Sequence, residues 1–293
     1  MKKTSKFHAL GLAGALLAGP VTLPAATAAS PVISHQARLA SSLGLHGRGG
    51  IHSTWAASNW SGYAETGTFA GVSGTWTVPS VSATSSASYS AAWVGVDGFS
   101  NSNLIQTGTE QDYYNGAAHY DAWWEILPAA ETEISPSHYP VSPGDRMSAS
   151  IYETTTTISS GGRHQRQTAR EWVITISDQN HGWSFTTDQA YSGPGTSAEW
   201  IMEAPEVGGR IASLAHYTVT PPTNTGDFDN AGILTTPVSA GTPTYKGAAL
   251  NYANDSGVMI QNGAQVSTPG NPDGALTAYN VAYGSTVPAT PAG

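Results

Sequence analysis

The stretch Thr196-Ser197-Ala198-Glu199-Trp200-Ile201-Met202-Glu203-Ala204-Pro205-Glu206 predicts a β-strand with two different faces. Side chains alternate along a strand, so Trp200 and Met202 share one face while Glu199 and Glu203 share the other. A strand rises ~3.3 Å per residue, which places the two carboxylates roughly 13 Å apart, too far to share a proton. Each carboxylate therefore needs a partner from another strand.

Short runs rich in Thr, Val, Tyr and Trp recur along the rest of the chain, separated by many of its 33 Gly and 18 Pro residues. No segment shows a sustained apolar period of 3.6 residues. This pattern is typical of an all-β sandwich or barrel. The expected strands are Trp60–Glu65, Gly74–Val78, Ser88–Asp97, Asn103–Gly108, Ala118–Leu127, Arg146–Glu153, Ala169–Ser177, Trp183–Thr187, Ser197–Ala204, Ser213–Val219, Gly257–Gln261 and Ala275–Val281.

Two of the other expected strands also combine acids and aromatics on one face. Alternation within 92–98 and 120–126 turns the apolar residues to the core and leaves a second, mixed face. The residues on these mixed faces are Trp93, Asp97, Asp121, Trp123 and Glu125. A solvated face favours Thr, Ser and Lys, whereas acids beside large aromatics are typical of a concave binding cleft. The sequence therefore predicts a functional cleft on the face that carries Glu203.

The two ends of the chain differ in composition from the part between them. Residues 1–28 combine Lys, an apolar run and an Ala-x-Ala site, which predicts a signal peptide and a secreted, extracellular protein of bacterial type. Residues 29–54 contain no acid but several His and Arg, as in a propeptide or a disordered basic arm. Residues 55–283 are then the folded domain, and residues 284–293 a flexible tail.

The charge of the domain limits its partners. All 20 acidic residues lie after Thr54 but only six of the 11 Lys and Arg do, so the domain carries a formal charge of −14 against −9 for the whole chain. Binding of nucleic acid or of an anionic membrane calls for basic patches, so neither is expected. The chain has no Cys, so its core rather than disulfides must stabilise it, and we expect a soluble monomer.

The residue types present exclude most hydrolytic mechanisms. Without Cys there is no thiol nucleophile, and no G-x-S-x-G motif is present. The five histidines of the domain show neither a triad signature nor the H-E-x-x-H spacing of a metal site, so no metal or other cofactor is expected. Hydrolysis would therefore have to rest on Glu or Asp.

Gln106 stands in the motif Ile105-Gln106-Thr107-Gly108, between two of the mixed strands. The preceding strand reads Trp93-Val94-Gly95-Val96-Asp97-Gly98, and the following one Tyr120-Asp121-Ala122-Trp123-Trp124-Glu125. Together with Ser58-Asn59-Trp60-Ser61-Gly62 and Ala198-Glu199-Trp200-Ile201-Met202-Glu203, the chain resembles the eqolisins, the glutamic peptidase family of pepstatin-insensitive acid endopeptidases. The resemblance runs in order from about Trp60 to Tyr283, and its short motifs are jointly specific.

This resemblance implies an antiparallel β-sandwich of two large sheets with a concave substrate cleft. It also implies hydrolysis of polypeptide substrates in acid by a Gln/Glu dyad without a cofactor. The family's catalytic Gln corresponds to Gln106, and its catalytic Glu corresponds to Glu203 rather than to Glu199. The implied substrate-binding positions are Trp60, Trp93, Asp97, Gly108, Asp121, Trp123 and Glu125.

The chain departs from the family pattern at two positions, and two other function classes fit part of it. Glu110 stands where fungal members have Asp, and Leu127 replaces an aromatic. A sandwich-type glycoside hydrolase could use Glu125 and Glu203 if their carboxyls lie about 5–5.5 Å apart. A carbohydrate-binding, lectin-like sandwich would use the same aromatics. The Gln-Thr-Gly motif favours the peptidase, because neither alternative needs an amide facing a carboxylate.

The basic segment suggests a means of regulation. We expect Ser30–Thr54 to act as an inhibitory prosegment whose Arg38, Arg48 and histidines bind the acidic cleft near neutral pH. Acid would neutralise the carboxylates and release the segment. The sequence therefore predicts a zymogen.

Overall fold

The computed structural model describes residues 30–41, 53–159, 166–220 and 225–292, without the side chains of residues 156–170. The predicted signal peptide therefore lies outside the described residues, as does most of the second half of the predicted prosegment. From Pro31 onward the described residues form one compact unit. No helix among them is long and apolar enough to cross a membrane.

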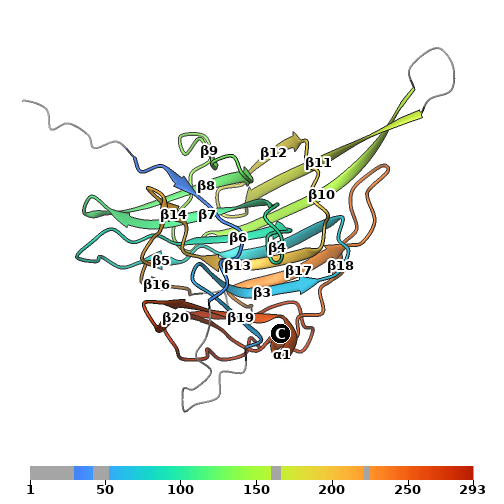
Figure 1. Cartoon of the computed structure of the whole chain (residues 1–293). Coiled ribbons are helices and arrows are strands. Elements are labelled where there is room, and N and C mark those ends of the chain that lie inside the picture. The colour runs from blue at the N-terminus through green and yellow to red at the C-terminus, as the bar shows by residue number, and fades with distance from the viewer. Residues whose placement is uncertain (1–29, 42–52, 160–165, 221–224, 293) are drawn as a thin grey trace, which may run out of the picture. The chain divides into compact units, whose positions relative to one another are not determined.

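Among the described residues, two large sheets contain most of the strands (Figure 1). The six-stranded sheet has the order β12 (Trp183–Gln189), β11 (Arg166–Asp178), β10 (Arg146–Ser159), β4 (Gly71–Thr77), β17 (Phe228–Leu234) and β18 (Lys246–Gly247). The ten-stranded sheet has the order β21 (Val281–Tyr283), β20 (Ala264–Pro269), β19 (Ser256–Gln261), β3 (Trp60–Thr66), β13 (Ser197–Glu203), β6 (Ala91–Val96), β7 (Ile105–Tyr114), β8 (Ala117–Ile126) and β9 (Thr132–Ile134), with β2 (Trp55–Ala57) added beside β19.

The smaller elements connect these sheets. Two small sheets pair β1 (Ile33–Ser34) with β14 (Glu206–Val207) and β15 (Arg210–Ile211), and β5 (Ser80–Val81) with β16 (Tyr217–Thr218). The helix α1 spans only Tyr252–Asp255. All pairings between named strands are antiparallel except β2 with β19 within the described chain. The predicted all-β antiparallel sandwich is confirmed.

The ten-stranded sheet has an apolar cluster on each face, of which the alternation along β13 predicted only the one that contains Trp200 and Met202. Trp200 and Met202 belong to the main core with Trp76 of the six-stranded sheet, and the Trp200 indole donates to the carbonyl of Ser73 at 2.8 Å. A separate apolar cluster covers the opposite face of the sheet, here called the outer face. Its members are Trp55, Ala57, Trp60, Ala64, Ala91, Trp93, Leu104, Trp123 and Ile201.

Two expected strands are largely absent, and among the described strands longer than three residues two were not predicted. Most of Ala275–Val281 is loop, because the Asp273 carboxylate accepts hydrogen bonds from the backbone N–H groups of Thr277 and Ala278 in place of a neighbouring strand. Of Ser213–Val219 only Tyr217–Thr218 is strand. These two longer unpredicted strands are β17 and β20, and the short strands β1, β2, β5, β9, β14, β15 and β18 were not predicted either. β17 carries a bulge between Asp229 and Gly232, which breaks its apolar alternation.

Residues 31–41, here called the arm, pack against the outer face of the ten-stranded sheet. In Figure 1 the arm begins with β1, which pairs with β14 directly after the strand that ends at Glu203. Its other end is held by a bridge between Ala40 and Ala57 and by a hydrogen bond from Ser58 N to Leu39 O at 2.9 Å. At the opposite terminus, residues 284–292 form no helix or strand.

Candidate active site

Strand register brings the predicted site residues together from four strands. Across β13, β6, β7 and β8, one row contains Glu203, Ala91, Glu110 and Asp121, and another contains Glu199, Gly95, Gln106 and Glu125. The row between them contains Ile201, Trp93, Gly108 and Trp123. All of these residues face the same side of the sheet, because alternate positions of a strand share a face. The expected common face is therefore present, with the tryptophans between the two carboxylate rows.

Glu203 is buried and uses both carboxylate oxygens. The Trp93 indole N–H donates to Oε2 at 2.7 Å, and His35 Nδ1 lies 3.0 Å from the same oxygen. The backbone N–H of Gln36 donates to Oε1 at 3.2 Å. One contact thus comes from the sheet and two come from the arm, so after release of the arm the Trp93 indole would be the remaining hydrogen-bond donor to this carboxylate among the described residues.

Gln106 is buried on the same face and is oriented by Glu125. Its amide Nε2 donates to Glu125 Oε2 at 2.7 Å, while its Oε1 is buried without a hydrogen-bond partner in the described structure. The other oxygen of Glu125 accepts from His35 N at 3.3 Å and from the Ser34 hydroxyl at 3.2 Å. The arm backbone therefore lies between the carboxylates of Glu125 and Glu203.

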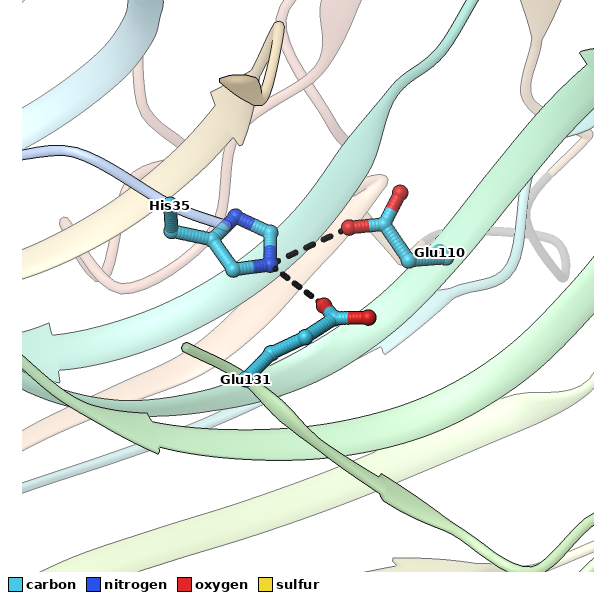
Figure 2. A group of neighbouring side chains, drawn as sticks. All are labelled: His35, Glu110 and Glu131. Carbon is cyan, nitrogen blue, oxygen red and sulfur yellow. Dashed lines mark hydrogen bonds and ion pairs between the residues drawn. The ribbon is translucent and has the colours of Figure 1, made fainter. Parts of the chain in front are cut away.

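His35 occupies the centre of this arrangement. Its ring stacks on Trp123 with 3.7 Å between centroids and 15° between planes. Figure 2 shows its Nε2 facing Glu110 Oε1 and Glu131 Oε2, each at 3.1 Å. With Glu203 on Nδ1, the fully buried imidazole contacts three carboxylates. This is the geometry of an imidazolium ion, in which both ring nitrogens donate.

The rest of the arm is fixed by backbone contacts rather than by its other charges. Asn59 accepts from Leu39 N at 2.8 Å and donates to the carbonyls of Gln36 and Ala37 at 3.2 Å. The Arg38 guanidinium lies 4.2 Å from the ring centroid of Phe99 and donates to its carbonyl. The predicted pairing of Arg38 with the acidic cleft is therefore wrong in detail, because an aromatic ring holds this cation. Arg48 lies outside the described residues.

The other predicted substrate-binding residues divide into packing and lining positions. Trp60 packs edge-on against Trp93 at 4.9 Å. Gly108 lies beneath Trp93, and a Cβ there would approach the Trp93 Cβ to 2.5 Å, so glycine lets the indole lie close to the sheet. Asp121 lies at the edge of the site, in the same row as Glu110.

Asp97 binds a loop of the protein itself. It has φ of 74° at the end of β6, and its carboxylate accepts from Tyr191 OH at 2.7 Å and from the backbone of Gly195 and Thr196 at 2.9 Å. Asn101 also donates to it at 2.9 Å. The structure therefore places this carboxylate as a support for the segment that leads into β13.

Burial alters the acidities around His35. Burial and the neighbouring Glu110 and Glu131 raise the pKa of Asp121 to about 8. Burial also raises the pKa of Glu125 to about 7, although His35 opposes the shift. Burial and Asp112 raise the pKa of Glu110 well above its ordinary value. Burial acts against the charge of His35, but Glu203, Glu110 and Glu131 together raise its pKa well above its ordinary value.

Two groups of side chains among the described residues could hold a metal ion by their spacing: His35 with Glu110 and Glu131, and Asp145 with Asp178 and His181. Direct contacts of 2.8–3.1 Å between His and carboxylate atoms account for both groups without an ion. The Asp-Ser-Gly triplet at 255–257, a type also found in aspartic peptidases, has a structural role instead, since Asp255 accepts from Asn251 N at the start of α1.

Three contributors to the site were not identified individually from the sequence. His35 was expected only as one of several basic residues of the prosegment, and Glu131 lies in a loop with no strand alternation to place it. Asn59 was noted only as part of a motif. The sequence feature that could have identified Asn59 is its position directly before Trp60, the first residue of β3, where its side chain binds the arm at Leu39.

Comparison with protein-family models assigns the sequence to a known family. The model of the peptidase A4 family matches residues 58–267, which include all four strands of the site. The chain belongs to the peptidase A4 family. The resemblance to the eqolisins is thereby confirmed.

Two characterised relatives match part of this A4 family member. It is 29% identical to aspergillopepsin-2 of Aspergillus niger over 181 residues, 55% of this chain and 60% of the relative. It is 35% identical to scytalidopepsin B of Scytalidium lignicola over 148 residues, 50% of this chain and 51% of the relative. The chain therefore spans little more than half the length of the relatives it matches.

Solved structures support the fold of this A4 family member. A crystal structure of scytalido-glutamic peptidase with a transition state analog inhibitor has a TM-score of 0.55 at 23% identity, covering 77% of this chain and 98% of that one. A second structure of the same peptidase, with a peptide-based analog, has a TM-score of 0.52 over the same shares. The β-sandwich is thus shared.

Proposed function

We propose that this protein is an acid endopeptidase in which Glu203 activates water and Gln106 stabilises the tetrahedral intermediate. The observation that carries the proposal is the position of the arm backbone between Glu203 and Glu125, the carboxylate that accepts a hydrogen bond from Gln106. Gln36 N lies 3.2 Å from Glu203 Oε1, as the nitrogen of a scissile peptide bond would lie next to its proton donor. Family membership supports the same reaction class.

The chemistry follows from the two residue types. A carboxylate can take a proton from water as the water attacks the carbonyl carbon, and can then give that proton to the leaving nitrogen. The amide of Gln106 cannot ionise, but its N–H can donate to the developing oxyanion. The Trp93 N–H, at 2.7 Å from Glu203, stabilises the ionised carboxylate between turnovers. In these steps water is the nucleophile, Glu203 transfers the proton and Gln106 donates to the oxyanion, so no nucleophilic side chain takes part.

The carbohydrate alternatives receive no comparable support. The tryptophans of the outer face are occupied by protein, with Trp60 against Trp93 and Trp123 against His35. Glu125 accepts a hydrogen bond from the arm backbone as well as from Gln106, so the site already holds an extended polypeptide. The extended chain in the site thus favours a polypeptide substrate.

A simple assay tests the proposed function. The acid-treated full chain should clear casein near pH 4 in the presence of pepstatin and of a metal chelator, and should leave polysaccharides intact. A Glu base operates in this range because its ordinary pKa is about 4.3. Release of reducing sugar without peptide release would assign the site to carbohydrate instead.

We also propose that the protein is exported as a precursor whose arm inhibits it. The composition of residues 1–28 supports export, and the arm contacts with Glu203 and Glu125 support inhibition. Five carboxyl groups face the His35 ring or its backbone: Glu110, Asp121, Glu125, Glu131 and Glu203. Burial raises the pKa of Glu110, Asp121 and Glu125, and the neighbouring carboxylates raise the pKa of His35. As the pH falls, protonation of Glu110, Asp121 and Glu125 weakens their attraction to the charged His35, so the arm binds more weakly.

The replacement His35→Ala is expected to raise the activity of the uncleaved precursor near pH 5.5 by about 10- to 100-fold, since charge-assisted hydrogen bonds contribute roughly 1.5–3 kcal/mol each. A fluorogenic peptide measures the rate, and gel electrophoresis confirms that the precursor is intact. His138→Ala, at an exposed loop position, is the matched control. If the His35 variant were as latent as the wild type, the arm would not be an inhibitor.

A further inference from the structure

The His35 side chain fills a pocket that belongs to the sheet and its loops rather than to the arm. This pocket, here called the imidazole pocket, has the Trp123 ring as one wall and the carboxylates of Glu110 and Glu131 at the far edge of the imidazole. Figure 2 shows these two carboxylates facing the ring. Glu203 closes the near edge. All of these residues come from the folded domain, so the pocket remains when the arm leaves.

Glu110 shows that the pocket is built to receive a ligand. Its side chain is 1% exposed, and neither of its oxygens has a hydrogen bond of good geometry in the described part of the chain. Its ion-pair contact there is with His35, on a segment that the proposed function requires to move away. When His35 leaves, the buried Glu110 still has the acidic side chain of Asp112 as a neighbour. Two buried carboxyl groups side by side are costly when charged, so a cation or a proton must replace His35.

The shape of the pocket selects the kind of cation. A ring plane 3.7 Å from Trp123 requires a flat group, and carboxylates at both ends require donors on opposite edges. Imidazolium meets both conditions, and the guanidinium of Arg meets them as well, because it is planar, stacks on aromatic rings and carries several N–H donors. The ammonium of Lys has the charge but no plane to stack.

The arm also shows where the selected residue lies in a substrate. The N–H next to Glu203 Oε1 belongs to Gln36, and His35 is the residue on the acyl side of that peptide bond. The leaving nitrogen of a substrate must occupy a similar place to receive the proton from Glu203. The pocket therefore corresponds to the side chain directly before the scissile bond.

We propose that the imidazole pocket is a specificity site, and that the protein prefers to cleave polypeptides after His or Arg. This inference rests on the proposed function. Glu110, the residue at which the chain departs from the fungal pattern, is the specificity-determining side chain, since it is the buried one of the two carboxylates at the far edge, with Glu131 13% exposed.

The test compares three peptides that differ only in the residue before the expected bond: His, Arg or Leu. The acid-treated full chain cleaves each at pH 6 rather than at pH 4, because protonation of the pocket carboxyls in more acidic solution removes the charge that this comparison measures. Mass spectrometry identifies the bond. We expect kcat/KM for the His and Arg peptides to exceed that for the Leu peptide by about tenfold, as one buried charge-assisted contact predicts. Glu110→Gln should reduce this ratio about tenfold, whereas Asp188→Asn, exposed on β12 of the other sheet, should leave it unchanged. A ratio near one in the wild type, or an unchanged ratio in Glu110→Gln, would overturn the inference.

Binding without catalysis separates this inference from the proposed function. The probe is the peptide acetyl-Val-Ile-Ser-His-Gln-Ala, which has the sequence of residues 32–37, and its partner has Leu in place of His. Calorimetry on the full chain with His35→Ala should show about tenfold tighter binding of the His peptide at pH 6. If this difference in binding appears but casein and the peptides are not cleaved, the proposed function is rejected and the preference of the imidazole pocket for His is supported. Cleavage of casein with equal binding of both peptides would reject the pocket alone.

Discussion

Replacing Glu203 by Gln is expected to lower kcat by about a thousandfold or more, because a positioned general acid–base typically contributes 10²–10⁴ and Gln can neither take nor give the proton. The change keeps the size and shape of the side chain, and Gln can still accept the hydrogen bond from Trp93. Cleavage of a fluorogenic peptide at pH 4 measures the loss, and thermal unfolding checks that the fold is retained.

Glu199 provides the matched control for this experiment. It lies on β13 on the same face as Glu203 and is equally buried, but it shares a row with Gln106 and Gly95 rather than with Glu110. Burial raises the pKa of Glu199 well above its ordinary value. Neither of its carboxyl oxygens has a hydrogen bond of good geometry among the described residues, so Glu199→Gln should change kcat little. Near-normal cleavage by a folded Glu203→Gln protein would contradict the assignment of Glu203 as the general base, whatever the activity of the Glu199 variant.

Replacing Gln106 by Ala should lower kcat by roughly 10²–10³, the usual effect of removing one oxyanion donor. KM should change less, because the donor acts mainly when charge develops on the carbonyl oxygen. The same change removes the 2.7 Å hydrogen bond to Glu125, which lowers the pKa of that carboxyl. The Glu125 pKa should therefore rise above about 7 in the variant, as NMR titration can show.

Gln189→Ala is a suitable control, since Gln189 ends β12 on the six-stranded sheet and its amide contacts only Thr187 among the described hydrogen bonds. A Gln106→Ala protein with unchanged kcat and a displaced Glu125 pKa would mean that Gln106 only positions its neighbour. An unchanged pKa with a large loss of kcat would assign its whole effect to the reaction.

Alternation along single strands predicted which side chains lie on the outer face. The period of two in β13, β6 and β8 separated core residues such as Trp200 from face residues such as Trp93, and the structure confirms that division. Periodicity alone could not say that Glu203 and Glu110 share one row while Gln106 and Glu125 share another, since strand order and register depend on the whole sheet.

The position of the arm was the least predictable part. Composition indicated a basic segment attracted to an acidic domain, but β1 has only two residues and its local sequence carries no strand signal. His35 is selected by one flat ring and three carboxylates that come together only after the sheet has formed. Asp97 shows the same limit: its left-handed backbone turns the carboxylate toward residues 191–196, which no pattern within 92–98 reveals.

The pairing of β1 with β14 has a consequence for how broadly the site can act. When the arm leaves, Glu206 and Val207 stay paired with β15 on one side and offer unpaired backbone groups on the other. An extended peptide can add there as a new strand, through main-chain hydrogen bonds that do not depend on its side chains. Under the specificity proposed above, binding of the polypeptide and choice of the bond are separate tasks: the edge of β14 would bind an extended chain through its backbone, and the residue in the imidazole pocket would select the bond.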